Sequence, residues 1–181
     1  TDIIVFWSSR GLWTIRDVTR IHFGTSSDIA VPADYNGDGT DEIGVFRKST
    51  GLWALKGSTR VYFGASIDLP IPGDYNGDGS SDIAIFRSSV GLWAIRNITR
   101  VYFGTNGDIP VPNHYQISGI DDIAVFRPGA GLWAIRNFSR IYFGSSTNWA
   151  VPGCCTGNLA RPAVFEDNRG LWAIRGITRC Y

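Results

Sequence analysis

Two short loops carry closely spaced carboxylates that together could bind a metal ion. They read ADYNGDGTDEIGVFR at residues 33–47 and GDYNGDGSSDIAIFR at residues 73–87. In each loop, side chains with oxygen atoms occupy the first, third, fifth and ninth positions, and glycines permit a sharp turn. Ca²⁺ takes about six to eight oxygen ligands from loops of this kind. The expected ligands are Asp34, Asn36, Asp38, the Thr40 carbonyl and Glu42 in the first loop, and Asp74, Asn76, Asp78, the Ser80 carbonyl and Asp82 in the second.

A solvated turn that binds nothing is the alternative interpretation of these loops. It leaves the clustered carboxylates to repel one another, and it does not explain why the same string recurs before a strand-like segment. Two later segments have lost the pattern, the third with His114, Gln116, Ser118 and Asp122 and the fourth with Cys154, Thr156, Asn158 and Pro162. We therefore expect two calcium sites of structural role, and no good Ca²⁺ site in the other two loops.

A repeat with a period of 40 residues organises the whole chain. Its clearest mark is the tripeptide GLW, which begins at Gly11, Gly51, Gly91, Gly131 and Gly170. Self-similarity at a fixed period is typical of repeat architectures. We predict a single domain over residues 1–181, with units at about 1–27, 28–67, 68–107, 108–147 and 148–181.

Each unit contains four short segments with strand character. In the unit of residues 68–107 they are Asp68–Tyr75, Asp82–Arg87, Gly91–Arg96 and Thr99–Gly104. They are rich in β-branched and aromatic residues and are bounded by Gly, Ser, Asn or Asp, whereas no long stretch has helical periodicity. Four antiparallel strands in each repeat predict an all-β fold, a five-bladed β-propeller.

The ring of blades is incomplete in the sequence. The second, third and fourth strands of the unit occur five times, but the first strand occurs four times. One blade is therefore expected to lack its innermost strand, unless a second molecule or a flanking segment supplies it. A monomer and a dimer formed through the incomplete blade are both open alternatives.

The order of these motifs resembles a known repeat family. FG, an apolar strand and then DYNGDGSSDIAIF are similar to the FG-GAP or VCBS-type repeat of integrin α-subunit propellers and of many secreted bacterial proteins. The resemblance covers essentially the whole chain, although two of its four loops depart from the calcium pattern. It implies a secreted or cell-surface calcium-binding β-propeller with a role in adhesion or carbohydrate binding.

Charge and composition make several other classes of protein a poor fit. The formal net charge is +1 and arginine is spread along the chain, so we expect no nucleic-acid partner. No apolar run reaches the roughly 18 residues of a membrane span.

His22 and His114 stand in no recognisable catalytic motif, and we expect no enzymatic activity. The three cysteines, Cys154, Cys155 and Cys180, are an odd number, so at least one thiol is unpaired or pairs outside the chain.

Two repeated residue types and two isolated tryptophans are further candidates for binding. The GLW tryptophans Trp13, Trp53, Trp93, Trp133 and Trp172 are expected to pack between blades, with a ring of sugar-stacking platforms as the alternative. Arg20, Arg60, Arg100, Arg140 and Arg179 suit a solvated sheet edge, or else a binding site for sulfated or sialylated glycans. Trp7 and Trp149 break the repeat and are candidate ligand-binding residues.

These observations favour a secreted binding or adhesion module that holds two Ca²⁺ ions and recognises glycans or a surface protein. The alternative is a purely structural or protein-interaction repeat unit of a larger surface protein, with no site for a small ligand.

Overall fold

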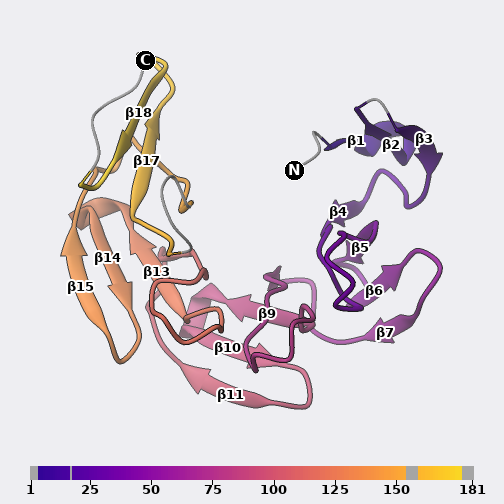
Figure 1. The fold of residues 1–181 in the computed structure, drawn as a ribbon, viewed down its shortest axis with the longest axis horizontal. Helices are drawn as coiled ribbons and strands as arrows, with labels where there is room; N and C mark the ends of the chain where they lie inside the picture. Colours follow the sequence, from indigo (N-terminus) through magenta and orange to yellow (C-terminus); the bar gives the residue numbers. More distant parts are fainter. Residues whose placement is uncertain (1–3, 17, 154–158, 177–181) are drawn as a thin grey trace.

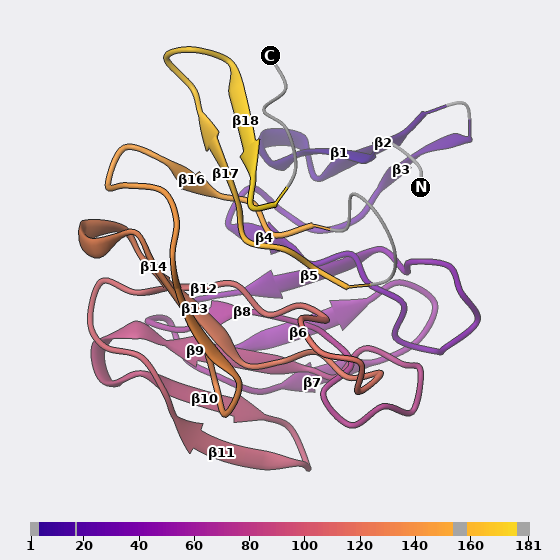
Figure 2. The same ribbon diagram turned by 60° about the vertical axis from the view of Figure 1, so that its left-hand side comes forward.

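The protein is described by a computed structural model that covers residues 4–16, 18–153 and 159–176. It is all-β, with five small antiparallel sheets that follow one another along the chain. Each sheet is one blade, and consecutive blades lie side by side (Figure 1, Figure 2). The predicted five-bladed β-propeller is confirmed.

The strands of each blade are short and consecutive in sequence. Blade 1 contains β1 (Ile4–Trp7), β2 (Leu12–Ile15) and β3 (Thr19–His22). Blade 2 contains β4 (Asp28–Ala30), β5 (Gly44–Arg47), β6 (Leu52–Leu55) and β7 (Arg60–Tyr62). Blade 3 contains β8 (Leu69–Pro70), β9 (Ala84–Arg87), β10 (Leu92–Ile95) and β11 (Thr99–Tyr102). Blade 4 contains β12 (Ile109–Pro110), β13 (Ala124–Arg127), β14 (Leu132–Ile135) and β15 (Ser139–Tyr142). Blade 5 contains β16 (Trp149–Ala150), β17 (Ala163–Glu166) and β18 (Leu171–Ile174).

The described helical structure is limited to three short turns. They are the 3₁₀ turns η1 (Ser8–Arg10), η2 (Ser88–Val90) and η3 (Pro128–Ala130), and each joins the first two long strands of its blade. No helix in the described ranges is long and apolar enough to cross a membrane.

The blades lie along an arc, with blades 1 and 5 at its two ends (Figure 1). The strands β7, β11 and β15 lie at the outer rim, and each is the last of its blade (Figure 1). Within the described residues, blade 1 has no counterpart of β4, in agreement with the prediction of one blade without its innermost strand. Cys154, Cys155, Cys180 and Arg179 lie outside the described residues.

The innermost strands are shorter than the sequence predicts. The prediction for blade 3 was a strand over Asp68–Tyr75, but β8 covers Leu69–Pro70 alone. Proline has no N–H to donate, so Pro70 and Pro72 interrupt the ladder. Pairing with β9 continues discontinuously, through the hydrogen bond from Ile71 N to Ala84 O at 2.9 Å and an isolated bridge from Gly73 to Asp82.

One contact explains why GLW and FG recur together in the sequence. In blade 3, Phe103 N donates to Gly91 O at 2.8 Å, which closes the outer hairpin. Gly91 has φ +63°, and a Cβ at this position would overlap the carbonyl oxygen of Gly104. Glycine is therefore required here, both for its backbone conformation and for the close approach of the two chains.

The core lies between the blades. The tryptophans of the first four GLW motifs are 0–1% exposed, and each packs against the next blade; they are Trp13, Trp53, Trp93 and Trp133. Trp93 also donates its Nε1–H to Phe103 O at 2.9 Å. Packing between blades, and not sugar stacking, is what these four side chains do.

The two ends of the arc leave the same kind of packing surface open. Trp172 in blade 5 is 45% exposed, although its four counterparts are buried. Val5 in blade 1 is 43% exposed, whereas its counterpart Val45 is 3% exposed. The face that normally meets a following blade and the face that normally meets a preceding blade are therefore both uncovered.

Candidate functional site

The first acidic loop connects β4 and β5 and gathers three carboxylates. An isolated bridge between Ala33 and Glu42 closes its base. Within the loop, one oxygen each of Asp34, Asp38 and Glu42 lies within 4.8 Å of the others. Oxygens that share one Ca²⁺ at about 2.4 Å lie at most about 4.8 Å apart. The three residues can therefore contact a single cation, and they are the first, fifth and ninth positions predicted from the sequence.

Backbone hydrogen bonds hold this loop in shape. Asp34 accepts from Gly37 N at 2.6 Å and from Gly39 N at 2.8 Å. Both glycines have positive φ, 76° and 88°, a conformation that side chains with a Cβ disfavour. Beneath the loop, the Tyr35 hydroxyl donates to Val31 O at 2.8 Å. The turn is thus formed by the chain's own hydrogen bonds, so a cation would meet a largely preorganised site.

The fifth residue of each acidic loop is held in its ionised form. Hydrogen bonds from the Thr40 hydroxyl and backbone N–H, and from Asn36, lower the pKa of Asp38. Ser80 and Asn76 lower the pKa of Asp78 in the same way. Both carboxylates are exposed and charged at neutral pH, as a hard cation requires of its ligands.

The second acidic loop, between β8 and β9, has the same turn, but its carboxylates lie farther apart than those of the first loop. Asp74 accepts from Gly77 N at 2.6 Å and from Gly79 N at 2.9 Å. Asp82 accepts from Tyr75 N at 3.0 Å, but it is one methylene shorter than Glu42. Among the described residues, the first loop is the group that brings three carboxylates within the distance given above.

Charge repulsion is visible in the second loop. Burial is the largest cause that raises the pKa of Asp82, and the charges of Asp78 and Asp74 raise it further. A bound cation would offset that repulsion. The second loop therefore has the charge for a cation, although its carboxylates would have to move closer together to bind one.

Adjacent loops are joined by one recurring hydrogen bond. Ser81 N donates to Asp34 O, Asp121 N to Asp74 O and Ala160 N to His114 O, each at 2.6 Å. The four loops therefore follow one another from blade to blade, and an ion in one loop would restrain the next.

Side-chain hydrogen bonds connect the ligand positions of the third loop. Gln116 Nε2 donates to Asp122 Oδ1 at 2.7 Å, where the acidic loops have an Asn. Asp121 accepts from Asp74 N at 2.9 Å and lies 3.7 Å from His114 Nδ1. Burial raises the pKa of Asp121, while His114 acts against this. This loop offers a single carboxylate among the four ligand positions, as the sequence predicts.

The fourth loop differs from the sequence alignment by one residue. An isolated bridge joins Gly153 to Arg161, and this bridge corresponds to the one between Asn113 and Asp122. The ninth position therefore belongs to Arg161, and the alignment that placed Pro162 there was wrong because the deleted residue lies earlier in the loop. A guanidinium at a ligand position opposes cation binding. Cys154, Thr156 and Asn158 lie outside the described residues.

A buried ion pair recurs in three blades and was missed in the sequence. In blade 3, Arg87 Nε and Nη2 contact Asp68 Oδ1 and Oδ2 at 2.7 and 3.0 Å, and the Asp68 side chain is fully buried. Asp68 also accepts from Ala65 N at 2.8 Å, which fixes the turn after FG. The equivalent pairs are Asp28–Arg47 and Asp108–Arg127. The available signal was an Asp and an Arg 19 residues apart in each of these units.

Two of the paired carboxylates, those of Asp28 and Asp108, are stabilised in their charged form. Burial raises the pKa of Asp28, but hydrogen bonds from Arg47 and from Thr25 N, and the charge of Arg47, outweigh burial and lower it overall. The pKa of Asp108 is lowered by the same kinds of contact. Blade 5 has lost the pair, since Asn148 and Glu166 stand at these positions and Asn148 Nδ2 is buried without a hydrogen-bond partner.

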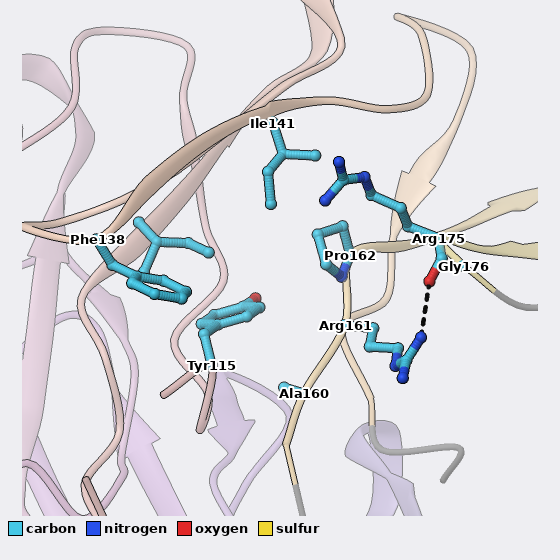
Figure 3. A pocket seen from close by; sticks show the side chains of 9 residues that line it. Tyr115, Phe138, Ile141, Ala160, Arg161, Pro162, Arg175 and Gly176 are labelled. Carbon is cyan, nitrogen blue, oxygen red and sulfur yellow. Dashed lines mark hydrogen bonds between the residues drawn. The ribbon is translucent and has the colours of Figure 1, made fainter. Parts of the chain in front are cut away.

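A cavity of about 420 Å³ lies between blades 4 and 5. In Figure 3 the rings of Tyr115 and Phe138 lie on one side of it, and Arg161 and Arg175 on the opposite side. Arg161 Nη1 donates to Arg175 O at 3.4 Å. The corresponding cavity between blades 3 and 4 is lined by Asp121 and Asp122, so the loss of the loop carboxylates makes the cavity in Figure 3 the more positive of the two.

The two isolated tryptophans do not form a common site. Trp7 lies in β1 and is 57% exposed, whereas Trp149 lies in β16 and is 65% exposed. These strands belong to the blades at opposite ends of the arc (Figure 1). The equivalents of Trp149, Leu69 and Ile109, are exposed as well, at 37% and 41%. Exposure is therefore shared by this position in blades 3, 4 and 5, whereas the blade 2 equivalent, Ile29, is half-buried.

Comparison with models of known protein families, with curated proteins and with solved structures finds no match to this chain.

Proposed function

We propose that this protein is an extracellular calcium-binding β-propeller that acts as a binding or adhesion module. The observation that carries the proposal is the convergence of Asp34, Asp38 and Glu42 on one point in a preorganised turn. A second loop of the same pattern follows 40 residues later and carries Asp74, Asp78 and Asp82. The FG-GAP or VCBS resemblance of the sequence agrees with this proposal and supplies its extracellular setting.

The calcium ions would stabilise the arrangement of the blades and would take no part in a reaction. Each loop offers several oxygen ligands, which leaves little room for a substrate, and the loops lie at the joints between successive blades. Extracellular modules bind Ca²⁺ with dissociation constants of about 10⁻⁴ to 10⁻³ M. At the millimolar Ca²⁺ outside cells, sites of this affinity would be about half to nine-tenths occupied, and the bound ions would restrain neighbouring blades.

Calorimetric titration with Ca²⁺ tests this proposal. We expect two ions per chain in the unmodified protein, and weaker binding by at least about tenfold at one site in Asp38→Asn, because that change removes a charged ligand. Asp78→Asn should weaken the other site. Asp167→Asn is the matched control, because Asp167 is an exposed aspartate in the turn between β17 and β18. No Ca²⁺ binding to the unmodified protein, or equal loss in the control, would contradict the proposal.

A protein-interaction repeat is the second candidate, and the open ends of the arc favour it. Trp172 presents a surface that elsewhere packs against a following blade, and Val5 presents the surface that elsewhere receives a preceding blade. A further unit of the same repeat, or a second molecule, could pack on these faces as successive blades pack on one another. Sedimentation at increasing protein concentration separates the candidates, because a recognition module needs no self-association whereas an assembly unit does.

A further inference from the structure

Two equivalent cavities recur where successive blades meet, on the face that carries the Asp–Arg pairs. One, of about 380 Å³, lies between blades 2 and 3, and the other, of about 500 Å³, lies between blades 3 and 4. They share lining residues 40 positions apart in sequence. The first is lined by Tyr62, Arg87, Leu92 and Arg100, and the second by Tyr102, Arg127, Leu132 and Arg140. We call them the Tyr–Arg cavities.

One wall of each Tyr–Arg cavity is a tyrosine side chain that is mostly exposed to solvent. Tyr62 and Tyr102 are 72% and 73% exposed, so they add little to the core. They lie in the outer strands β7 and β11, and a tyrosine recurs at this position in three consecutive blades although the neighbouring loops have diverged. Aromatic faces stack well on the C–H faces of ring-shaped polar molecules, with a polar hydroxyl at the edge.

Each cavity also contains two arginine side chains, one held in an ion pair and one without a carboxylate partner among the described residues. Arg87 is fixed by its bidentate contact with buried Asp68 and is 31% exposed, so its remaining N–H groups are held at a defined place in the cavity wall. Arg100 lies in β11 of the same blade, two strands away from Arg87; it is exposed and has no carboxylate within ion-pair distance in the described part of the chain. The fixed pair is neutral overall, so Arg100 leaves the cavity with one uncompensated positive charge.

A ligand for this arrangement needs a flat apolar face for the tyrosine and an anionic group for the unpaired arginine. A guanidinium binds carboxylate or sulfate through two parallel N–H···O contacts. We propose that the Tyr–Arg cavities bind anionic sugar residues, such as uronic acids or sulfated sugars, one in each cavity. This inference rests on the recognition part of the proposed function and is independent of calcium.

The repeat provides an internal comparison. At the joint between blades 4 and 5, Tyr142 is present, but Glu166 replaces the fixed arginine and Asn148 replaces its aspartate. A carboxylate there repels an anionic ligand, so this joint should not bind. The two binding cavities lie on neighbouring joints, and a polyanionic glycan that reached both would gain affinity by avidity.

Calorimetric titration with a heparin-derived tetrasaccharide at 150 mM salt tests the inference, with maltotetraose and inorganic sulfate as comparison ligands. We expect the tetrasaccharide to bind and both comparison ligands to bind at least about tenfold more weakly. We expect an affinity at least about tenfold lower in each of two double variants, Arg100→Gln/Arg140→Gln and Tyr62→Ala/Tyr102→Ala. The first removes the arginine that would bind the anionic group, and the second removes the tyrosine that would stack on the sugar ring. Their melting temperatures should stay near that of the unmodified protein, since all four side chains are exposed.

Arg10→Gln/Arg169→Gln is the charge-matched control, because both arginines are exposed and lie in the β1–β2 and β17–β18 connections. It should change the affinity by less than about twofold. Equal loss in this control would show general charge attraction and overturn the inference, as would equal binding of maltotetraose or of sulfate. No tetrasaccharide binding, together with two Ca²⁺ ions per chain, would overturn the sugar inference and leave the calcium proposal standing.

Discussion

Replacing Trp93 by alanine is expected to lower the free energy of unfolding by about 3–5 kcal/mol. The Trp93 side chain is 0% exposed, packs at the joint between blades 3 and 4, and donates to Phe103 O. Its removal leaves a cavity at that joint and an unsatisfied carbonyl group. Denaturant unfolding monitored by circular dichroism measures the loss.

Trp172→Ala is the matched control for this experiment. Trp172 has the same position in its repeat but is 45% exposed, so its removal should cost about 2 kcal/mol. The comparison holds residue type and strand position constant and varies the covering blade. Equal losses in the two variants would show that packing between blades is not what stabilises the tryptophan.

Replacing Asp68 by alanine is expected to cost about 2–3 kcal/mol of stability. Loss of one partner from a fully buried ion pair costs about 3–5 kcal/mol, because the other charge is left without compensation. The expected value is smaller here because Arg87 is 31% exposed and stays partly hydrated. The variant also leaves Ala65 N without its acceptor. Thermal and denaturant unfolding would measure the effect.

Blade 5 offers the converse experiment. The double variant Asn148→Asp/Glu166→Arg rebuilds the pair found in blades 2, 3 and 4, and removes the unsatisfied amide of Asn148. It should raise stability by about 1 kcal/mol. Asn148→Asp alone should destabilise, because two carboxylates would then face each other. A double variant less stable than Asn148→Asp would contradict this account of the pair.

The repeat made the fold predictable from the sequence. Five copies of one 40-residue pattern predicted the blade count, and in blade 3 the strand-like segments predicted three of the four strands nearly as the structure has them. The inner strand was predicted too long because local composition favours strand from Asp68 to Tyr75, whereas Pro70 and Pro72 remove donors from the ladder. Strand propensities describe how well side chains suit a sheet, so they do not predict the loss of backbone hydrogen-bond donors at the prolines.

The site was predictable where its residues are close in sequence and not elsewhere. Asp34, Asp38 and Glu42 lie within nine positions, so their spacing alone predicted that their carboxylates lie close together. The Asp68–Arg87 pair links an inner turn to the end of β9, and only the sheet register brings these side chains together. The same holds for the Tyr–Arg cavities, whose walls come from two blades.

The displaced alignment of the fourth loop has a similar origin. One deleted residue can be placed at several positions in a loop that has lost its pattern, and only the bridge from Gly153 to Arg161 locates it. The structure therefore makes the fourth loop a worse cation site than the sequence suggested, with an arginine at the ninth position.

Thermal unfolding in excess EDTA, followed by return of Ca²⁺ or of Mg²⁺ in separate samples, tests the central claim that the acidic loops bind calcium. With ligand at about 100 times its dissociation constant, binding at one site stabilises the folded state by about 2.7 kcal/mol. We expect the melting temperature to fall by several degrees in EDTA and to recover in Ca²⁺ but not in Mg²⁺ at equal concentration. An unchanged melting temperature in all three conditions would show that the loops are ordinary turns and would contradict the claim.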